Sequence, residues 1–234
     1  MPIAPVAVVR PRERILAAAR ELFHRHGIRG VGVDTIADAA GTNKMTLYRH
    51  FESKDELVLA YVRMVAAEGE AMWQEIASDH PGDSQAQLED WLMRANDCIS
   101  VDGRGCDLAN TAVELTEDNH PARRLIEQLK TDHRDRLATL CHAAGVVQSE
   151  ALADTLTLLW EGARVSRLTA GRRGPSAEFI RTARTVIETF KGKPTRKPDY
   201  AQALSPTTRL KKIVHPKKIA SARSAAAASV KAKR

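Results

Sequence analysis

A helical period in the apolar residues, which runs from about residue 12 to residue 191, constrains this chain more than any other feature. Between residues 12 and 26, Ile15, Ala19, Leu22 and Phe23 recur at steps of three and four, as on one face of an α-helix. Glycine, proline and polar turn residues divide the rest into segments of the same period, and no convincing alternating strand pattern appears. The sequence therefore predicts an all-α fold.

The period predicts three short helices followed by longer ones. Residues 12–26, 33–40 and 44–51 form the short group, and a long helix runs from Ser53 to about residue 77. Ser53 with Glu56 three residues later is a capping-box pattern. Further helices are expected at 84–100, 104–116, 121–144, 149–170 and 176–191. We therefore expect a small domain over residues 10–56 and a helical domain over 57–191.

The two ends of the chain differ from this pattern. Residues 1–9 contain prolines and no helical period, which predicts a flexible arm. Residues 193–234 contain 12 lysines and arginines but only one acidic residue, Asp199, so this segment carries +11 whereas residues 1–192 carry −4. We expect residues 192–234 to be a disordered basic tail. Such a tail can bind phosphates without sequence preference, although many basic tails are only solvated.

Composition excludes several classes of protein. No stretch reaches the roughly 20 uncharged apolar residues of a membrane span. The N-terminal apolar segment precedes its charges, the reverse of a secretory signal, so we expect a cytoplasmic location. The three cysteines, Cys98, Cys106 and Cys141, form no C-x-x-C pair. Reduced structural thiols are favoured over a Cys98–Cys106 redox switch, and the histidine spacing predicts neither a metal site nor a cofactor.

The turn between the second and third predicted helices points to a function. Gly41-Thr42-Asn43 joins two short helices, and the second one directs polar residues outward. This is the helix-turn-helix arrangement, which sets one helix in the major groove of DNA. Taken alone the pattern is weak, because short helical hairpins with a glycine turn are common.

The surrounding residues carry a stronger signal. From residue 14 to residue 57, A-x-x-L-F, G, V-x-x-I-A-x-x-A-G, T-L-Y-x-H-F and x-S-K-x-x-L follow one another at fixed spacing. This segment, about a fifth of the chain, resembles the DNA-binding region of the tetracycline-repressor (TetR) family. The resemblance implies an N-terminal helix-turn-helix domain followed by a helical ligand-binding and dimerisation domain.

The resemblance also implies which residues contact DNA. The third helix is then the recognition helix. The residues on it or next to it that are expected to contact DNA are Lys44, Met45, Thr46, Tyr48, Arg49, His50 and Lys54. Lysine and arginine can donate to guanine, threonine can contact the thymine methyl group, and a tyrosine hydroxyl can donate to phosphate. Where the family has hydroxyl residues before its second helix, this chain has Val31 and Gly32, so Thr35 becomes the candidate hydroxyl there.

The C-terminal half offers less specific candidates. The residues considered for the lining of an effector pocket are Trp73, Trp91, Asn110, Glu114 and Trp160. Asn110 and Glu114, four apart, would share a helical face. Apolar stripes at Leu152, Leu156, Leu159 and Ala163, and at Phe179, Ala183, Val186 and Phe190, fit either the twofold interface implied by the resemblance or an internal core.

These observations favour a transcriptional regulator. We expect a homodimeric repressor that binds palindromic double-stranded operator DNA and is released by an unknown small-molecule effector. The alternative is an architectural DNA-binding protein that uses the basic tail. An enzyme is not expected, since no nucleophile elbow, phosphate loop or paired metal motif occurs in the sequence.

Overall fold

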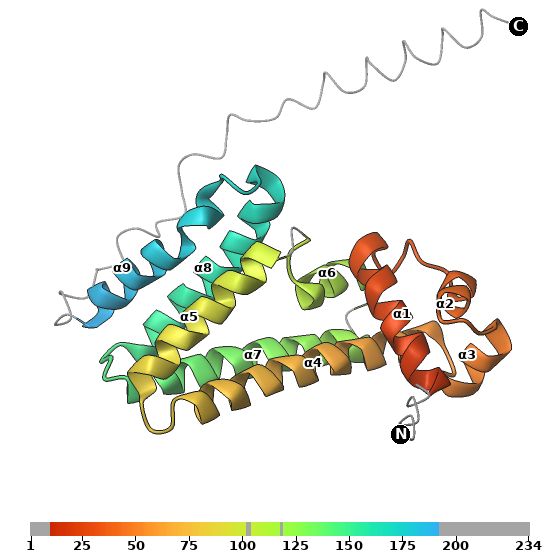
Figure 1. Ribbon diagram of the computed structural model, residues 1–234, viewed down its shortest axis with the longest axis horizontal. Coiled ribbons are helices and arrows are strands. Elements are labelled where there is room, and N and C mark those ends of the chain that lie inside the picture. The colour runs from red at the N-terminus through yellow and green to blue at the C-terminus, as the bar shows by residue number, and fades with distance from the viewer. Residues whose placement is uncertain (1–9, 102–103, 118, 192–234) are drawn as a thin grey trace, which may run out of the picture. The chain divides into compact units, whose positions relative to one another are not determined.

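The computed structural model describes residues 10–101, 104–117 and 119–191, and within these ranges every regular element is helical. In chain order the helices are α1 (Pro11–His26), α2 (Val33–Ala39), α3 (Lys44–His50), α4 (Lys54–Asp79), α5 (Ser84–Val101), α6 (Asp107–Glu114), α7 (Pro121–Ala143), α8 (Ser149–Ala170), the 3-10 turn η1 (Pro175–Glu178) and α9 (Phe179–Lys191) (Figure 1). The all-α prediction is confirmed. The predicted arm and basic tail lie outside the described residues.

Two helices begin three residues later than predicted. The helix expected over 104–116 begins only at residue 107, because Gly105 has a φ of 88°, which cannot continue a right-handed helix. It ends at Glu114, since Leu115 is extended. The last helix is preceded by a 3-10 turn that begins at Pro175, a residue suited to the first turn of a helix.

The first core lies among α1, α2, α3 and the start of α4. Its largest fully buried side chains are Ile15, Ile36, Leu47, Phe51, Leu57 and Tyr61. Two residues of α7, Ala122 and Ile126, belong to the same cluster. This core therefore extends beyond residue 56, the boundary expected from sequence.

Side-chain caps begin the two helices next to the helix-turn-helix. Asn43 Oδ1 accepts from the backbone N–H of Thr46 at 2.9 Å, which starts α3. Ser53 Oγ accepts from the N–H of Glu56 at 3.0 Å, which starts α4 as the sequence predicted. The Glu56 carboxylate accepts from the N–H of Glu52 at 2.5 Å, one residue before the donor of an ordinary capping box.

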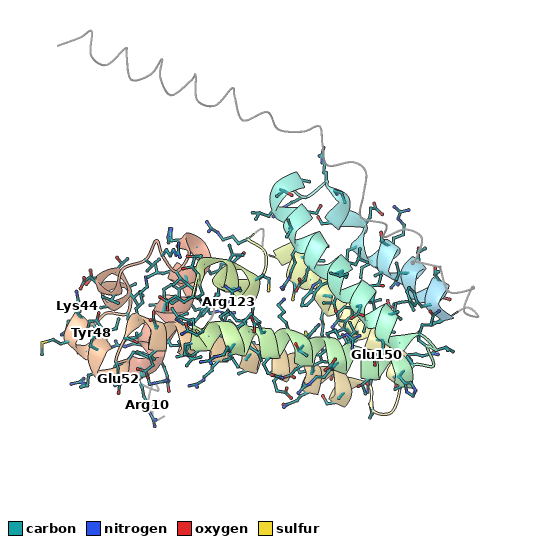
Figure 2. All side chains as sticks on the ribbon, turned by 180° about the vertical axis from the view of Figure 1, so that it is seen from behind. Arg10, Lys44, Tyr48, Glu52, Arg123 and Glu150 are labelled. Atoms are coloured by element: carbon teal, nitrogen blue, oxygen red, sulfur yellow. The ribbon has the colours of Figure 1, made fainter. Side chains whose placement is uncertain are left out.

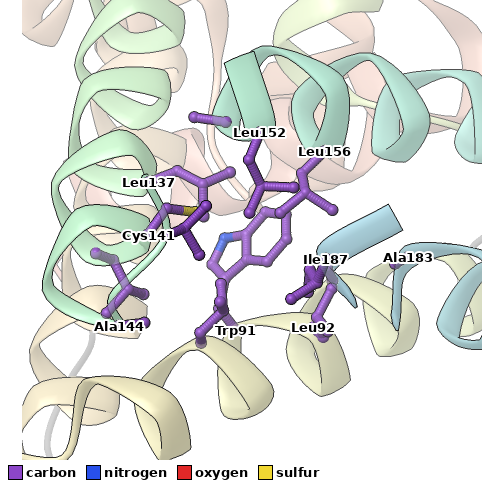
Figure 3. Packing of buried hydrophobic residues seen from close by; sticks show 14 of the residues in the cluster. Trp91, Leu92, Leu137, Cys141, Ala144, Leu152, Leu156, Ala183 and Ile187 are labelled. Atoms are coloured by element: carbon purple, nitrogen blue, oxygen red, sulfur yellow. The ribbon is translucent and has the colours of Figure 1, made fainter. Parts of the chain in front are cut away.

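The second core joins the end of α4 to α5, α7, α8 and α9. Trp91 lies inside it, enclosed by Leu92, Leu137, Cys141 and Leu152 among others (Figure 3). Both predicted apolar stripes contribute: Leu152, Leu156, Ala163, Phe179 and Ala183 are buried here, and Leu159, Val186 and Phe190 pack against them. Of the two alternatives for these stripes, the internal core is the one that the structure supports.

A different face of α8 is apolar and exposed. Leu158, Val165 and Leu168 expose 72%, 60% and 57% of their surface. Steps of seven and three residues put all three on one side of a helix. This face, Leu158–Val165–Leu168, has no counterpart in the stripes identified from sequence.

The thiols are free, as expected for reduced cysteines. Cys141 is buried, and burial raises its pKa to about 12. Cys98 and Cys106 are half-buried and unpaired with each other. Across the described ranges, no helix is long and apolar enough to cross a membrane, and no cluster of three metal-ligating side chains occurs.

Candidate functional site

Helix α3 has one buried and one exposed side. Leu47 is fully buried in the first core and anchors the helix. Met45 and Tyr48 expose 85% and 42% of their surface, and Lys44 and Arg49 are exposed as well. Lys44 and Tyr48 lie near each other at the outer surface (Figure 2). A short, capped helix therefore presents cations and a phenol to solvent from a fixed backbone.

Lys44 is held at the start of α3 by an acidic side chain of α2. Its Nζ lies 3.0 Å from Asp34 Oδ2, and both side chains are more than half exposed. The hydrogen bond and the charge of Asp34 raise the pKa of Lys44, so the ammonium stays charged. Thr35, the next residue along α2, is exposed.

The other predicted contacts are less exposed. Thr46 and His50 are half-buried, and His50 Nε2 has no hydrogen-bond partner within the described part of the chain. Lys54 Nζ donates to the Ile28 carbonyl at 2.6 Å, and burial lowers the pKa of Lys54. An ammonium group has three donors, so two remain for a phosphate.

The three tryptophans of the chain come together in the C-terminal half. They approach His133 of α7 from three helices: Trp73 of α4 at 5.3 Å between ring centroids, Trp91 of α5 at 6.0 Å and Trp160 of α8 at 5.2 Å. Trp91 is fully buried and belongs to the second core, whereas Trp73 and Trp160 are half-buried. We call Trp73, Trp91, His133 and Trp160 the aromatic cluster.

His133, the centre of this cluster, was missing from the sequence-based candidates. Its Nε2 atom is buried and has no hydrogen-bond partner among the described residues. Burial, followed by the charges of Lys130 and Arg164, lowers its pKa to about 4, so the ring is neutral at pH 7. A histidine on a long helix gives no periodic signal, and only tertiary packing reveals its neighbours.

Asn110 and Glu114, the two polar candidates for the pocket lining, bond to residues outside the aromatic cluster. Asn110 is exposed and donates from Nδ2 to the Arg104 carbonyl at 2.8 Å. Glu114 accepts from the backbone N–H of Arg29 at 2.8 Å, in the loop after α1. Gly27 is required beside it: its φ is 75°, and a Cβ there would lie 2.6 Å from Glu114 Oε1.

A second contact joins α6 to α1. His24 Nδ1 and Asp107 Oδ1 lie 2.5 Å apart, with 24% and 17% of their side chains exposed. Asp107 also faces Tyr61, whose pKa is raised by burial first and then by this carboxylate. Cys106, the preceding residue, accepts from Lys130 Nζ of α7 at 3.5 Å. The start of α6 therefore contacts both the helix-turn-helix region and the C-terminal helices.

Comparison with known proteins identifies the first of these regions. The profile described as "Bacterial regulatory proteins, tetR family" matches residues 15–61, which run from α1 into α4. The crystal structure of SCO4454, a TetR-family transcriptional regulator from Streptomyces coelicolor, superposes with a TM-score of 0.73 and 26% identity, over 78% of this chain and 96% of that one. Residues 15–61 therefore carry the DNA-binding region of the TetR family, and the chain is similar in fold to TetR-family regulators. It is a transcriptional regulator with a DNA-binding helix-turn-helix.

Two named relatives match over shorter segments. The HTH-type transcriptional activator FasR of Mycolicibacterium smegmatis is 48% identical over 52 residues, which are 22% of this chain and 24% of FasR. The HTH-type transcriptional repressor KstR2 of Rhodococcus jostii is 32% identical over 107 residues, 46% of this chain and 48% of KstR2. The chain thus matches less than half the length of either relative. Both are regulators of transcription and neither is an enzyme.

Proposed function

We propose that this TetR-family protein is a repressor that binds a palindromic operator as a homodimer and is released by a small-molecule effector. The exposed outer side of α3, which carries Lys44, Tyr48 and Arg49 on a buried anchor, is the observation that supports operator binding most directly. Cations and a hydroxyl on a rigid helix suit both base edges and phosphates.

Within this proposal the side chains of α3 divide by chemistry. Lys44 and Arg49 donate to guanine O6 and N7, while Met45 and Thr46 contact thymine methyl groups. Tyr48 donates its hydroxyl to phosphate.

Three further side chains complete the proposed interface. Thr35 on α2 and Lys54 on α4 flank the recognition helix as phosphate donors. His50, half-buried at the end of α3, is the third of these contacts.

The exposed face Leu158–Val165–Leu168 supports the dimer. Three large apolar side chains on one side of a helix favour burial against another copy, since isolated soluble chains rarely expose such patches. Two recognition helices about 34 Å apart would then read successive major grooves. Dimerisation through α8 is part of the proposal and replaces the two stripes predicted from sequence.

Release by an effector is supported by the contacts of α6. A ligand that binds one arrangement of the C-terminal helices better than another shifts the population between them. Through Asp107 and Glu114, α6 is bonded to His24 and to Arg29 of the helix-turn-helix region. A shift of α6 therefore changes the support of α1 and, in a dimer, the spacing of the two recognition helices.

The experiment is a fluorescence-anisotropy titration of the full chain onto DNA from upstream of its own gene and onto scrambled DNA. We expect clear preference for the upstream DNA, and Arg49→Ala to weaken that preference by about 1–3 kcal/mol per half-site. Arg181→Ala, on the exposed surface of α9, is the matched control and leaves binding unchanged.

A different result would contradict each part of the proposal. Equal binding to both DNAs, with Arg49→Ala and Arg181→Ala equivalent, would replace the operator-binding role with an architectural one. Activation of a reporter by the bound protein, as the name of FasR implies for that relative, would contradict repression.

A further inference from the structure

We propose that the effector is an apolar carboxylate, bound where Arg164, Lys130 and His133 adjoin the half-buried rings Trp73 and Trp160. This inference rests on the proposed function, because it names the class of molecule that the C-terminal domain would sense. Three independent features carry it: an uncompensated cation, an unsatisfied histidine nitrogen, and flat apolar walls beside both.

The uncompensated cation is Arg164 of α8. Its guanidinium carbon lies 4.3 Å from the centroid of the Trp160 ring, and the side chain is half-buried. Its Nε atom is buried without a hydrogen-bond partner, and among the described residues no carboxylate forms an ion pair with it. A desolvated guanidinium is costly unless an anion pairs with it, and a carboxylate matches its planar donors best.

His133 packs against Trp160, the same ring that Arg164 contacts. His133 stacks on Trp160 with an angle of 26° between the rings, and its buried Nε2 lacks a partner. A neutral imidazole with a proton on Nε2 donates to an oxygen acceptor. A carboxylate has two oxygens, so it can accept from His133 and from Arg164 together.

The charges around His133 favour an anion over a cation. Lys130, Arg164 and Arg136 act on the ring as positive charges, and the carboxylate of Glu161 opposes them. Aromatic boxes often hold cationic ligands. Here, however, the Trp160 ring already has Arg164 at 4.3 Å and Lys130 at 5.9 Å, so another cation would meet charges of its own sign.

Lys130 links the proposed carboxylate site to the start of α6. Its Nζ lies 2.6 Å from Glu161 Oε1 and also donates to Cys106 Sγ, the residue just before α6. The ammonium has three donors, so an incoming carboxylate takes the remaining one and draws the Lys130 side chain away from the Cys106 thiol, the weaker acceptor. A ligand at this position would therefore weaken the contact between α7 and the start of α6.

The test uses the intrinsic fluorescence of the full chain, because all three tryptophans lie in the aromatic cluster. The probes are octanoate, octanamide and octyltrimethylammonium, which share an eight-carbon body and differ in head-group charge. We expect saturable quenching by octanoate, with an affinity at least about tenfold above that of the other two. Arg164→Gln should remove that tenfold advantage, and Arg164→Lys should keep part of it.

The control and the contradictory outcomes are distinct from those of operator binding. Arg172→Gln removes the same charge from an exposed position after α8 and leaves octanoate binding unchanged. Equal affinity for the three probes, equal effects of Arg164→Gln and Arg172→Gln, or no saturable quenching at millimolar concentration would overturn the proposal. Octanoate binding that depends on Arg164 but does not alter DNA affinity would leave the ligand class standing and refute effector release alone.

Discussion

The bond between His24 and Asp107 allows a quantitative test of how α6 is attached to the helix-turn-helix region. Both side chains are more than three-quarters buried, and the atoms lie 2.5 Å apart. Asp107→Asn keeps the size of the side chain and removes its charge. A hydrogen bond to a charged group contributes about 1.5–3 kcal/mol, so the free energy of unfolding should fall by that amount. For a chain of this size the midpoint of thermal unfolding should drop by roughly 3–12 °C.

A double-mutant cycle isolates this bond from the other interactions of the two residues. His24→Phe keeps a ring and removes the nitrogen, and the cycle with Asp107→Asn is measured by urea unfolding. We expect a coupling energy of about 1.5–3 kcal/mol. The exposed pair Glu21–Arg25 on α1, 62% exposed on both sides, is the control, and its cycle should give no more than about 0.5 kcal/mol. A His24–Asp107 coupling as small as that of the control would refute the inference that this bond holds α6 against α1.

Three further changes have expected outcomes. Asn43→Ala removes the side-chain cap of α3 and should cost about 1 kcal/mol of stability, measured by urea unfolding, and an unchanged midpoint would contradict the cap. The pKa of His133 is lowered to about 4 in the folded protein, so this residue should destabilise the fold as pH falls below 6.5. His133→Phe should therefore reduce the loss of stability between pH 7 and pH 5 by about 2 kcal/mol, and an unchanged loss would mean that the ring is not buried as a neutral base. Leu158→Glu should shift the chain towards monomer in light scattering, whereas Val113→Glu on α6 should not, and equal behaviour of the two would contradict dimerisation through α8.

Local signals in the sequence were enough to predict most of the fold. Apolar period and cap residues act over one or two turns, so the helices and the role of Ser53 as a cap could be read from neighbouring residues. The same holds for the helix-turn-helix, whose buried anchor Leu47 and exposed cations lie within seven residues. Errors arose at Gly105 and Leu115, where the backbone leaves the helix although the side-chain pattern continues.

Contacts between helices were not predictable in this way. The four-residue spacing of Asn110 and Glu114 gives their face of a helix but not the neighbour that this face meets, which for Glu114 is the loop after α1. The stripes on the last two helices could not be assigned to core or interface, since either burial satisfies the same period. The three tryptophans were identified because ligand pockets have apolar walls, whereas His133 becomes a candidate only through the rings packed around it.

Helix α6 lies between the proposed DNA-binding and effector-binding regions. It is short, and residues from both regions contact its start. Cys106 accepts from Lys130 on one side, and Asp107 bonds His24 on the other. A helix of eight residues gains little from its own hydrogen bonds, so its position depends on such tertiary contacts. A helix that lies between two sites does not by that alone couple them. Coupling needs an element with two positions, and both the effector and the DNA must change how often each position is occupied. If an incoming carboxylate draws Lys130 away from Cys106, the start of α6 gains a second position, and by linkage operator DNA and effector would then weaken each other's binding to the same degree.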